Sequence, residues 1–281
     1  MSALADFTGS QETRWCIGFL VAALVASAAC RVRALTMSGG IAAALVGGTI
    51  VGTAGWWPGT VLVAFFITSS GLSRYSAARR PAGEQARGHR RDAVQVLANG
   101  GVPAFCALAS AAADSPCPWL VALCASVAGA ASDTWGTEVG RLSRSRPRLV
   151  TTWQTAPTGT SGAVSLPGTL GSVAGALLIG LVAGSGLVLG WNVPGIPGVG
   201  IIATVTLAGF AGSIVDSVLG ATVQASYRCP DCDQLTERRV HRCGTATELA
   251  GGVRWMNNDT VNLLAVSISA GLGLAAGAVW P

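Results

Sequence analysis

Acidic side chains occur inside segments of the chain that are otherwise apolar. The segments are RDAVQVLANGG at 91–101, ASDTWGTEVGR at 131–141, GFAGSIVDSVLGA at 209–221 and WMNNDTVN at 255–262. A carboxylate at the centre of a membrane-spanning helix costs about 2.5–3.5 kcal/mol on insertion scales, so an acid found there is a candidate functional residue if it faces protein. Asp133, Asp216 and Asp259 are therefore the first candidates for a site.

Helical spacing aligns these acids with small and polar residues. Positions i, i+3, i+4 and i+7 of a helix share a face, and small residues on that face let a backbone or a ligand approach closely. One such face consists of Asp133, Gly136, Thr137 and Gly140. Glu138 points elsewhere on the same helix unless the glycines unwind the turn.

The other three segments carry polar stripes of the same kind. Their members are Asp92, Gln95 and Asn99; Gly209, Gly212, Asp216 and Gly220, with Ser217 next to the acid; and Asn258, Asp259 and Asn262. All four stripes are predicted at the same end of their helices. Hydrogen bonding between helices explains one stripe, but four at one depth favour a shared polar site.

The loop that follows the 131–141 segment has the composition of a phosphate site. It reads RLSRSRPRLVTTWQTAPTGTSGAVSLPGT over 141–169. Its glycine-containing run consists of Thr158, Gly159, Thr160, Ser161 and Gly162. Such a run can turn backbone N–H groups towards an anion, and the next helix adds its positive N-terminus. Nearby carboxylates suit Mg²⁺, which shares phosphate oxygens with its substrate, although Walker and kinase glycine-loop motifs are absent.

A second loop contains residues that bind zinc in other proteins. The sequence CPDCDQLTERRVHRCG at 229–244 includes Cys229, Cys232, His241 and Cys243. Three thiolates and an imidazole can complete a tetrahedral Zn²⁺ site, and four protein ligands would make that site structural. The His-x-Cys spacing is tight for two ligands of one ion, so three free thiols are the alternative.

The segments that must hold these residues are predicted to cross a membrane. Only 11% of the 281 residues are charged, against roughly a quarter in ordinary globular proteins, and a membrane helix needs about 20 apolar residues. Charge-free runs and turn residues predict eight helices near 15–30, 35–54, 57–73, 94–112, 117–136, 168–190, 200–223 and 260–280. We expect an all-α polytopic membrane protein with a single transmembrane domain over 1–281, whose first helix is short for a straight span.

The basic residues predict the orientation of this domain. All 18 are arginines. With eight helices, every arginine except Arg14 falls in the loops 31–34, 74–93, 137–167 and 224–259, which share one side. The positive-inside rule places that side in the cytoplasm. We therefore expect a multi-pass protein of the cell membrane with both termini outside, and with the polar site and the cysteine-containing loop facing the cytoplasm.

Five blocks of the sequence resemble a known family. They are RRDAVQVLANGG (90–101), ASDTWGTEVG (131–140), PTGTSGAVSLPGTLGS (157–172), GFAGSIVDSVLGATVQ (209–224) and WMNNDTVNLL (255–264). From about residue 36 to the C-terminus, the chain is similar to integral membrane proteins once catalogued as domain of unknown function 92. That family includes the phytyl-phosphate kinase of plants and cyanobacteria. The resemblance implies an enzyme that converts an isoprenyl monophosphate, such as phytyl or geranylgeranyl phosphate, to its diphosphate with a nucleoside triphosphate, and CTP is the expected donor.

The resemblance and the polar stripes together assign roles to individual residues. The expected ligands of the magnesium–triphosphate are Asp133, Glu138 and Asp216, with Asp259 as a secondary ligand. The expected catalytic set adds Asn99 and Arg141. The expected set for substrate and nucleotide binding is Arg90, Arg91, Asp92, Gln95, Thr137, Thr158, Gly159, Thr160, Ser161, Gly162, Ser217, Asn258, Asp259 and Asn262.

The polar composition fits such a phosphoryl transfer. A phosphate monoester is already an anionic nucleophile at neutral pH, so the reaction needs positioning, a metal and charge neutralisation more than a base. The two histidines, His89 and His241, both lie in loops, and arginine can bind phosphate with two parallel hydrogen bonds. Small residues on the fourth, fifth and seventh helices are expected to leave a groove for the prenyl chain.

The sequence is also compatible with three other functions. A CTP-dependent lipid cytidylyltransferase would use similar residues but release pyrophosphate instead of CDP. A membrane transporter of a small solute would also keep acids in its helices, although transporter sites tend to lie near the midplane of the membrane. A structural membrane module would tolerate replacement of the acids by asparagine. The partners expected for the kinase are a prenyl phosphate, a nucleoside triphosphate and the bilayer, with no nucleic acid.

Overall fold

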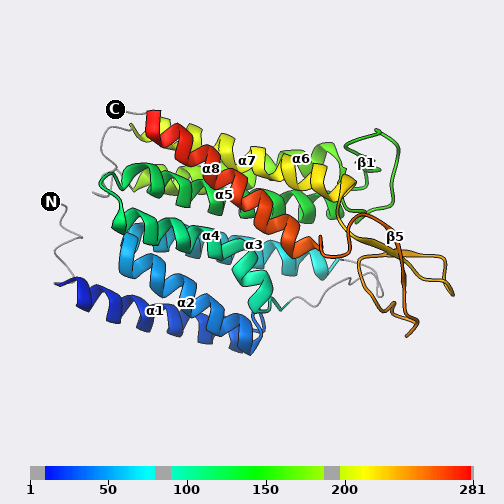
Figure 1. The fold of residues 1–281 in the computed structure, drawn as a ribbon, viewed down its shortest axis with the longest axis horizontal. Helices are drawn as coiled ribbons and strands as arrows, with labels where there is room; N and C mark the ends of the chain where they lie inside the picture. Colours follow the sequence, from blue (N-terminus) through cyan, green and yellow to red (C-terminus); the bar gives the residue numbers. More distant parts are fainter. Residues whose placement is uncertain (1–9, 80–89, 187–196, 280–281) are drawn as a thin grey trace.

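Each of the eight predicted segments is a helix in the computed structural model, which describes residues 10–79, 90–186 and 197–279. The helices are α1 (Gln11–Arg31), α2 (Met37–Ala54), α3 (Trp56–Ala77), α4 (Ala93–Ala112), α5 (Cys117–Leu142), α6 (Leu166–Ser185), α7 (Gly198–Thr222) and α8 (Asn258–Val279). The chain is therefore a helical bundle (Figure 1). The expectation of a short first helix is wrong, because α1 has 21 residues.

Short strands occupy two of the connections. Strands β1 (Arg148–Leu149) and β2 (Ala163–Val164) pair antiparallel between α5 and α6. Between α7 and α8, the strands β3 (Ser226–Arg228), β4 (Leu235–Thr236) and β5 (Glu248–Gly251) form an antiparallel sheet with β3 in the middle. These small sheets fold two long loops back onto the ends of the helices.

Local sequence sets where several helices begin. The side chains of Ser10, Thr36 and Ser165 each accept a hydrogen bond from a backbone N–H in the first turn of α1, α2 and α6, which satisfies a donor that has no partner inside the helix. The predicted turn between the second and third helices is confirmed at Gly55. Its φ of +92° ends α2 and starts α3, a backbone conformation that glycine adopts without strain.

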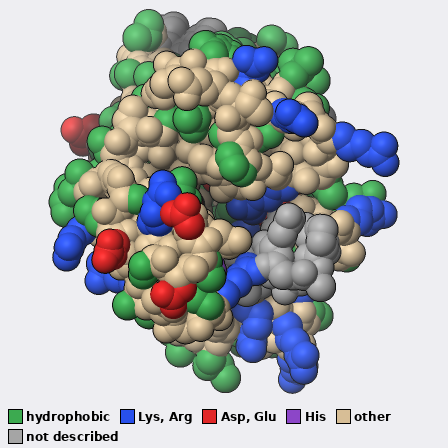
Figure 2. All heavy atoms as spheres, turned by 90° about the vertical axis from the view of Figure 1, so that its right-hand side faces the viewer, with side chains coloured by type: hydrophobic (Ala, Val, Ile, Leu, Met, Phe, Trp, Pro, Cys, Tyr) green, Lys and Arg blue, Asp and Glu red, His purple; other side chains and the backbone are tan. Residues whose placement is uncertain are grey.

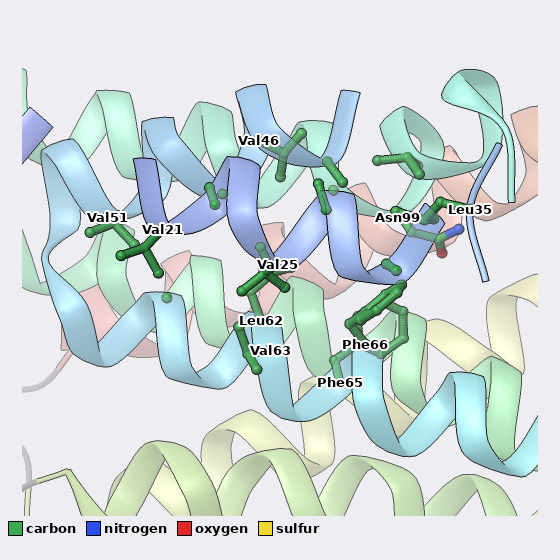
Figure 3. Close-up of a pocket in the computed structure, with 18 of the residues that line it drawn as sticks. Val21, Val25, Leu35, Val46, Val51, Leu62, Val63, Phe65, Phe66 and Asn99 are labelled. Carbon is green, nitrogen blue, oxygen red and sulfur yellow. The ribbon is translucent and has the colours of Figure 1, made fainter. Parts of the chain in front are cut away.

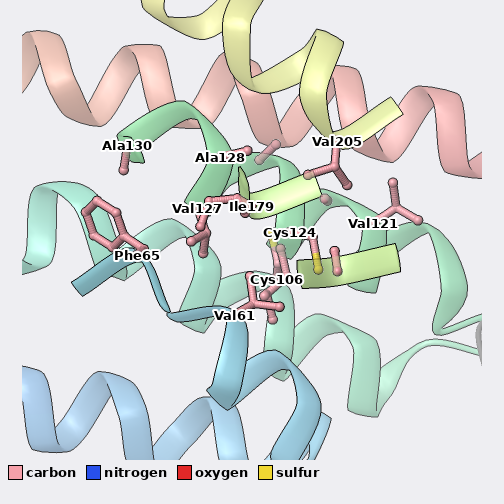
Figure 4. Close-up of a cluster of buried hydrophobic side chains, with 14 of the residues drawn as sticks. Val61, Phe65, Cys106, Val121, Cys124, Val127, Ala128, Ala130, Ile179 and Val205 are labelled. Atoms are coloured by element: carbon pink, nitrogen blue, oxygen red, sulfur yellow. The ribbon is translucent and has the colours of Figure 1, made fainter. Parts of the chain in front are cut away.

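Within the described residues, six helices are long and apolar enough to cross a membrane by length and composition: α1, α2, α4, α6, α7 and α8. Of the other two, α5 is the centre of the bundle and packs against α3, α4, α6, α7 and α8. Its residues from Val121 to Ser132 are all buried, and Figure 4 shows Val121, Cys124 and Val127 inside the main apolar cluster. A helix enclosed by other helices can carry acids without exposing them to lipid.

Small residues allow the helices around α5 to approach closely. A Cβ atom at Gly209 of α7 would lie 2.5 Å from the Cβ atom of Ala128, and one at Gly171 of α6 would lie 2.8 Å from the Cβ atom of Val139. Both distances are too short for a side chain, so these contacts require glycine. The close packing brings the ends of α5, α6, α7 and α8 together.

The connections that carry the arginines lie at one end of the bundle. Figure 1 shows β1 and β5 at this end, whereas the start of α1 and the end of α8 lie at the opposite end. Figure 2 looks onto the first end and shows many arginines and several acids on its surface. We call it the arginine-rich end; it comprises residues 31–36, 74–79, 90–92, 137–165 and 223–257. Which side of the membrane it faces stays a prediction.

Some predicted features lie outside the described residues. These are Arg80, Arg87, His89 and most of the turn expected at 191–200.

Candidate functional site

Asp133 and Asp216 meet at the arginine-rich end of the bundle. The two carboxyl groups, from α5 and α7, lie close enough to interact electrostatically, and both side chains are half-buried. With its amide oriented to face acceptors, Asn262 of α8 donates from Nδ2 to Oδ1 of Asp216 at 3.1 Å and to the carbonyl oxygen of Asn258 at 3.1 Å. Two carboxyl groups this close repel unless they share a proton or a cation. Three helices thus build one acidic site.

Glu138 extends the site by one turn of α5. The helix is continuous to Leu142, so the glycines do not unwind it, yet Glu138 is buried with a relative exposure of 8%. One guanidinium nitrogen of Arg141 lies 3.9 Å from Oε1 of Glu138. Arg91, which precedes α4, also interacts electrostatically with Glu138, and Arg141 interacts with Asp133. The acids are therefore flanked by two of the predicted arginines.

The sequence analysis missed Glu237, which follows β4. Its Oε1 accepts hydrogen bonds from Oγ of Ser161 at 2.7 Å and from Nε2 of Gln224 at 2.8 Å. Gln224 is buried and also donates to Oγ of Ser161 at 3.0 Å. The Glu237 carboxylate interacts electrostatically with Asp216. No helical spacing connects this loop glutamate with the stripes, so only the folded sheet of β3–β5 reveals it.

The predicted phosphate loop, residues 158–162, packs against the end of α7. Gly159 and Gly162 both have positive φ, at +88° and +73°, and a side chain at Gly162 would collide with the backbone of Ala221. Thr160 folds the loop through hydrogen bonds from its N–H and its hydroxyl to the carbonyl of Pro157 at 3.2 and 2.8 Å. Thr158 is exposed. The loop lies beside the acidic site because Ser161 contacts Glu237.

The stripe on α4 has local structural partners. Asp92 and Gln95 form a capping box, with Oδ1 of Asp92 accepting from the Gln95 N–H at 3.0 Å and Oε1 of Gln95 accepting from the Asp92 N–H at 3.2 Å. Nδ2 of Asn99 donates to the carbonyl of Gln95 at 3.0 Å. The guanidinium of Arg90 donates to the carbonyl of Leu35 at 3.2 and 3.3 Å. These bonds account for the polarity of Asp92, Gln95 and Arg90 without a ligand.

The remaining predicted residues are dispersed around the acidic site. Thr137 is exposed on α5, and the hydroxyl of Ser217 donates to the carbonyl of Ser213 within α7 at 3.1 Å. Asn258 and Asp259 are half-buried in the first turn of α8.

A polar cavity of about 270 Å³ lies between the sheet of β3–β5 and the start of α8. Its lining residues are Ala225, Tyr227, Glu237, Arg239, Arg254, Asn257 and Asn258. Glu237 therefore faces two features, the acidic site and this cavity. Arg239 and Arg254 were predicted only as determinants of topology, and neither appeared among the expected binding residues.

An apolar cavity of about 250 Å³ lies among α1, α2, α3 and α4. Figure 3 shows Val21, Val46 and Val63 along it, with Phe65, Phe66 and Asn99 towards the arginine-rich end. Its lining also includes Arg91, whose guanidinium carbon lies 5.4 Å from the centre of the Phe65 ring. The sequence analysis expected a groove along the fourth, fifth and seventh helices. This cavity differs, because α5 and α7 are closely packed by small residues and contribute none of its lining.

The four predicted zinc ligands converge in the loop between α7 and α8. The Sγ atoms of Cys229, Cys232 and Cys243 and a ring nitrogen of His241 all lie within 4.8 Å of one another. Hydrogen bonds with Thr245 and then His241 lower the pKa of the Cys243 thiol to about 6. A hydrogen bond with Cys243 is the main cause that raises the pKa of the Cys232 thiol to about 11. The cluster and Glu237 both belong to the connections of the β3–β5 sheet, because Cys229 directly follows β3 and Glu237 directly follows β4.

The acidic site has the donors that a hard divalent cation requires. Magnesium is bound through one or two carboxylates together with substrate phosphates, and Asp133 and Asp216 offer two carboxylates side by side. Glu138 adds a third carboxylate nearby, and the Nδ2 of Asn262 orients Asp216 by a hydrogen bond to its Oδ1. The residues present therefore fit Mg²⁺.

The fold and the site together define a class. The chain is a mostly helical integral membrane protein with a polar, acidic site at the arginine-rich end of its bundle. Within that class, it belongs to the family described as Integral membrane protein DUF92, which matches residues 20–270. The family resemblance found in the motifs is thereby confirmed, and the match extends further towards the N-terminus, into α1.

Relatives in plants and archaea cover most of the chain. Protein PGR of Arabidopsis thaliana is 32% identical over 92% of this chain and 95% of its own length. An uncharacterized membrane protein of Methanocaldococcus jannaschii is 29% identical over 92% of both chains. The chloroplastic protein VTE6 of A. thaliana is 29% identical over 82% of this chain and 61% of its own length. No solved structure matches the chain.

Proposed function

We propose that the protein is an isoprenyl-monophosphate kinase. It would transfer the terminal phosphoryl group of a nucleoside triphosphate, with CTP as the expected donor, to a prenyl monophosphate such as phytyl or geranylgeranyl phosphate. The observation that carries the proposal is the meeting of Asp133 and Asp216 beside Glu138, which interacts electrostatically with Asp133 and with Arg91, a lining residue of the apolar cavity. The resemblance of the motif blocks to a family that includes phytyl-phosphate kinase supports the same substrate class.

The apolar cavity suits the tail of the acceptor. Its walls are almost entirely aliphatic and aromatic, and, apart from Thr60 of α3, its polar lining residues are Arg91, just before α4, and Gln95 and Asn99 in the first turns of α4. An isoprenoid chain gains about 0.8 kcal/mol for each CH₂ group that leaves water. A prenyl phosphate bound with its chain between α1 and α4 would hold its phosphate next to Arg91. Because Arg91 also interacts with Glu138, this phosphate would lie beside the acidic site.

The polar cavity beside the β3–β5 sheet suits the donor. Arg239 and Arg254 line it, together with Asn257 and Asn258, and arginine pairs well with phosphate because its planar fork offers parallel N–H donors. Glu237 lines the cavity and interacts with Asp216. A nucleotide held there would direct its phosphates towards the acids of α5 and α7. The positive end of the bundle would also attract a soluble anion.

The reaction needs positioning and charge neutralisation from the chain. An oxygen of the acceptor phosphate bonds to the terminal phosphorus of the donor, and the bond between that phosphorus and the bridging oxygen breaks to release a nucleoside diphosphate. Arg91 and Arg141 would stabilise negative charge on the transferred group, and Asp133 and Asp216 would hold Mg²⁺. Bound there, Mg²⁺ would neutralise charge on the phosphates. Since the acceptor is already ionised, the site requires no general base.

The experiment is a product assay on purified protein in lipid nanodiscs. Phytyl, geranylgeranyl and farnesyl phosphates are each incubated with Mg²⁺ and one of four nucleoside triphosphates, and the products are separated by mass spectrometry. The kinase predicts a prenyl diphosphate and a nucleoside diphosphate in equal amounts. Release of pyrophosphate with a nucleotidyl lipid would instead identify a cytidylyltransferase. Absence of turnover with every pair, in protein that retains its helical circular dichroism, would reject the proposal.

A further inference from the structure

The loop between α7 and α8 contains a metal-binding geometry that the kinase reaction does not use. Cys229 and Cys243 have their Sγ atoms 3.6 Å apart, and Nδ1 of His241 lies 3.0 Å from Sγ of Cys243. In a tetrahedral zinc site, bond lengths of about 2.3 Å to sulfur and about 2.1 Å to nitrogen separate neighbouring ligand atoms by about 3.6–3.8 Å. A disulfide would instead bring two sulfurs to about 2.0 Å, and all three cysteines are free thiols.

Two tight turns present the ligands in pairs. In the first, the N–H of Asp233 donates to the carbonyl of Cys229 at 2.9 Å, and Asp233 has a positive φ of 51°. In the second, the N–H of Gly244 donates to the carbonyl of His241 at 3.0 Å, and Gly244 has a φ of +93°. The second turn explains how the close His-x-Cys spacing can serve one ion, because it brings both side chains to the same side of the loop.

A hydrogen bond links the two turns. The hydroxyl of Thr245 donates to Oδ2 of Asp231 at 2.5 Å, and Oγ1 of Thr245 lies 3.3 Å from Sγ of Cys243. Groups of this kind around a metal site orient its ligands. The two halves of the cluster are therefore held together by protein contacts as well as by the ligand residues.

The loop has little other means of holding its shape. All four residues of β5 are exposed, and among the described residues 226–255 only Tyr227 and Cys229 are buried. A small segment without an apolar core usually requires disulfides or a metal to fold. Nevertheless, this loop forms an ordered three-stranded sheet and holds Glu237 against Ser161 and Gln224.

We infer that Cys229, Cys232, His241 and Cys243 bind one Zn²⁺ ion, which stabilises the β3–β5 sheet and thereby positions Glu237. Four protein ligands leave no open position for a substrate, so the role is structural. The inference stands on the ligand geometry and on the exposed sheet, and it does not depend on which reaction the protein catalyses.

The test is the metal content of the full-length protein, purified in detergent without a chelator and measured by inductively coupled plasma mass spectrometry. We expect about one zinc per chain in the wild type and a loss of that zinc in Cys232→Ser and His241→Ala. His241→Cys preserves four soft ligands and should retain zinc. Cys16→Ser changes an exposed cysteine of α1, so it should retain zinc and serves as the matched control.

A second measurement tests the site in protein that has lost its metal during purification. Wild-type protein stripped with a chelator is titrated with Co²⁺, and thiolate ligands should produce an intense charge-transfer absorption that Cys232→Ser lacks. Wild type that contains no zinc and gives no such absorption would overturn the inference, as would iron in place of zinc. Equal zinc content in the wild type and in Cys232→Ser would also overturn it. None of these readouts depends on kinase activity, so the zinc site and the kinase can fail separately.

Discussion

The two halves of the bundle differ in what they enclose. Helices α1–α4 surround an apolar cavity of about 250 Å³, whereas α5, α7 and α8 are closely packed and bring together Asp133, Asp216 and Asn262. The first half offers a surface for a hydrocarbon chain, and the second offers oxygen ligands and charge. A molecule with a lipid tail and a phosphate would need both. In the proposed kinase, the first half would bind the tail and the second would act on the phosphate, and the two halves would meet at one residue.

That residue is Arg91, which lies between the two halves. It lines the apolar cavity and lies over the Phe65 ring, and it interacts with the buried Glu138 of α5. Three kinds of substitution test whether the halves have these separate roles: replacing the acids, replacing this arginine and filling the cavity. Each change has a different expected signature.

Replacing the acids of the second half should have the largest effect. Asp133→Asn and Asp216→Asn are each expected to lower kcat at least about 100-fold, a loss typical of removing an electrostatic contact made in the transition state. The melting temperature should not fall, because the change relieves repulsion between two carboxylates. The measurement is turnover of geranylgeranyl phosphate alongside a thermal unfolding curve.

The matched control for the acids is Asp114→Asn. Asp114 is exposed in the connection between α4 and α5, at the opposite end of the bundle from the site. We expect wild-type turnover from this variant. Wild-type turnover from Asp133→Asn or Asp216→Asn would refute the assignment of the site.

Removing the arginine that joins the halves should have the next largest effect. Arg91→Gln is expected to lower kcat/KM for a prenyl phosphate about 10- to 100-fold, since a hydrogen bond to a charged group contributes roughly 1.5–3 kcal/mol. Arg79→Gln is the control, because Arg79 is exposed and lies 3.5 Å over the Tyr75 ring instead of in the cavity. An equal loss in both variants would mean that general surface charge, and not a defined contact, binds the acceptor.

Filling the cavity of the first half should change substrate preference more than turnover. Ala43→Phe projects a ring into the cavity and should raise KM for geranylgeranyl phosphate about tenfold, which corresponds to excluding about two CH₂ groups. KM for a five-carbon prenyl phosphate should change little. The lipid-facing Leu45, 56% exposed on the same helix, provides the control Leu45→Phe. If the two variants had identical KM values for both acceptors, the prenyl tail would have to bind outside this cavity.

The capping residue of α4 should have the smallest effect. Asp92→Ala removes the capping box and is expected to lower the free energy of unfolding by about 1 kcal/mol, while Asp92→Asn keeps a good cap and should leave stability near that of the wild type. Thermal unfolding and turnover are measured on both variants. If Asp92→Asn lost turnover but kept its stability, Asp92 would have to be assigned to the binding site and not to helix capping alone.

Much of the fold could be predicted from the sequence because a membrane restricts the backbone conformations that a spanning segment can adopt. Backbone groups in hydrocarbon must be satisfied within the chain, so charge-free runs bounded by turn residues such as Gly55 become helices. The arginines then fix which connections share an end. The polar stripes predicted Asp133, Asp216 and Asn262 as partners, since helical spacing and a common depth were enough to place them on neighbouring helices.

The sequence alone could not predict contacts that depend on how loops fold. Glu237 reaches the site only because β3 pairs with β4 and because Ser161, 76 residues earlier in the chain, donates to it. Glu138 lies off the face of Asp133 on an isolated helix, and it becomes buried because α5 is enclosed and Arg91 and Arg141 lie beside it. Asp92 and Gln95 looked like site residues because a capping box has the same spacing as a polar stripe.

The sequence by itself determined the class of protein, the helices and the end of the bundle at which acids and arginines gather. These properties follow from the local balance between apolar and charged residues, which the membrane imposes on each segment separately. The tertiary structure decided that the cavity lies among α1–α4, that Glu237 joins the acids, and that four ligands from two tight turns converge. Those outcomes depend on packing between segments distant in the chain, where small residues such as Gly209 and Gly171 set how closely the helices can approach.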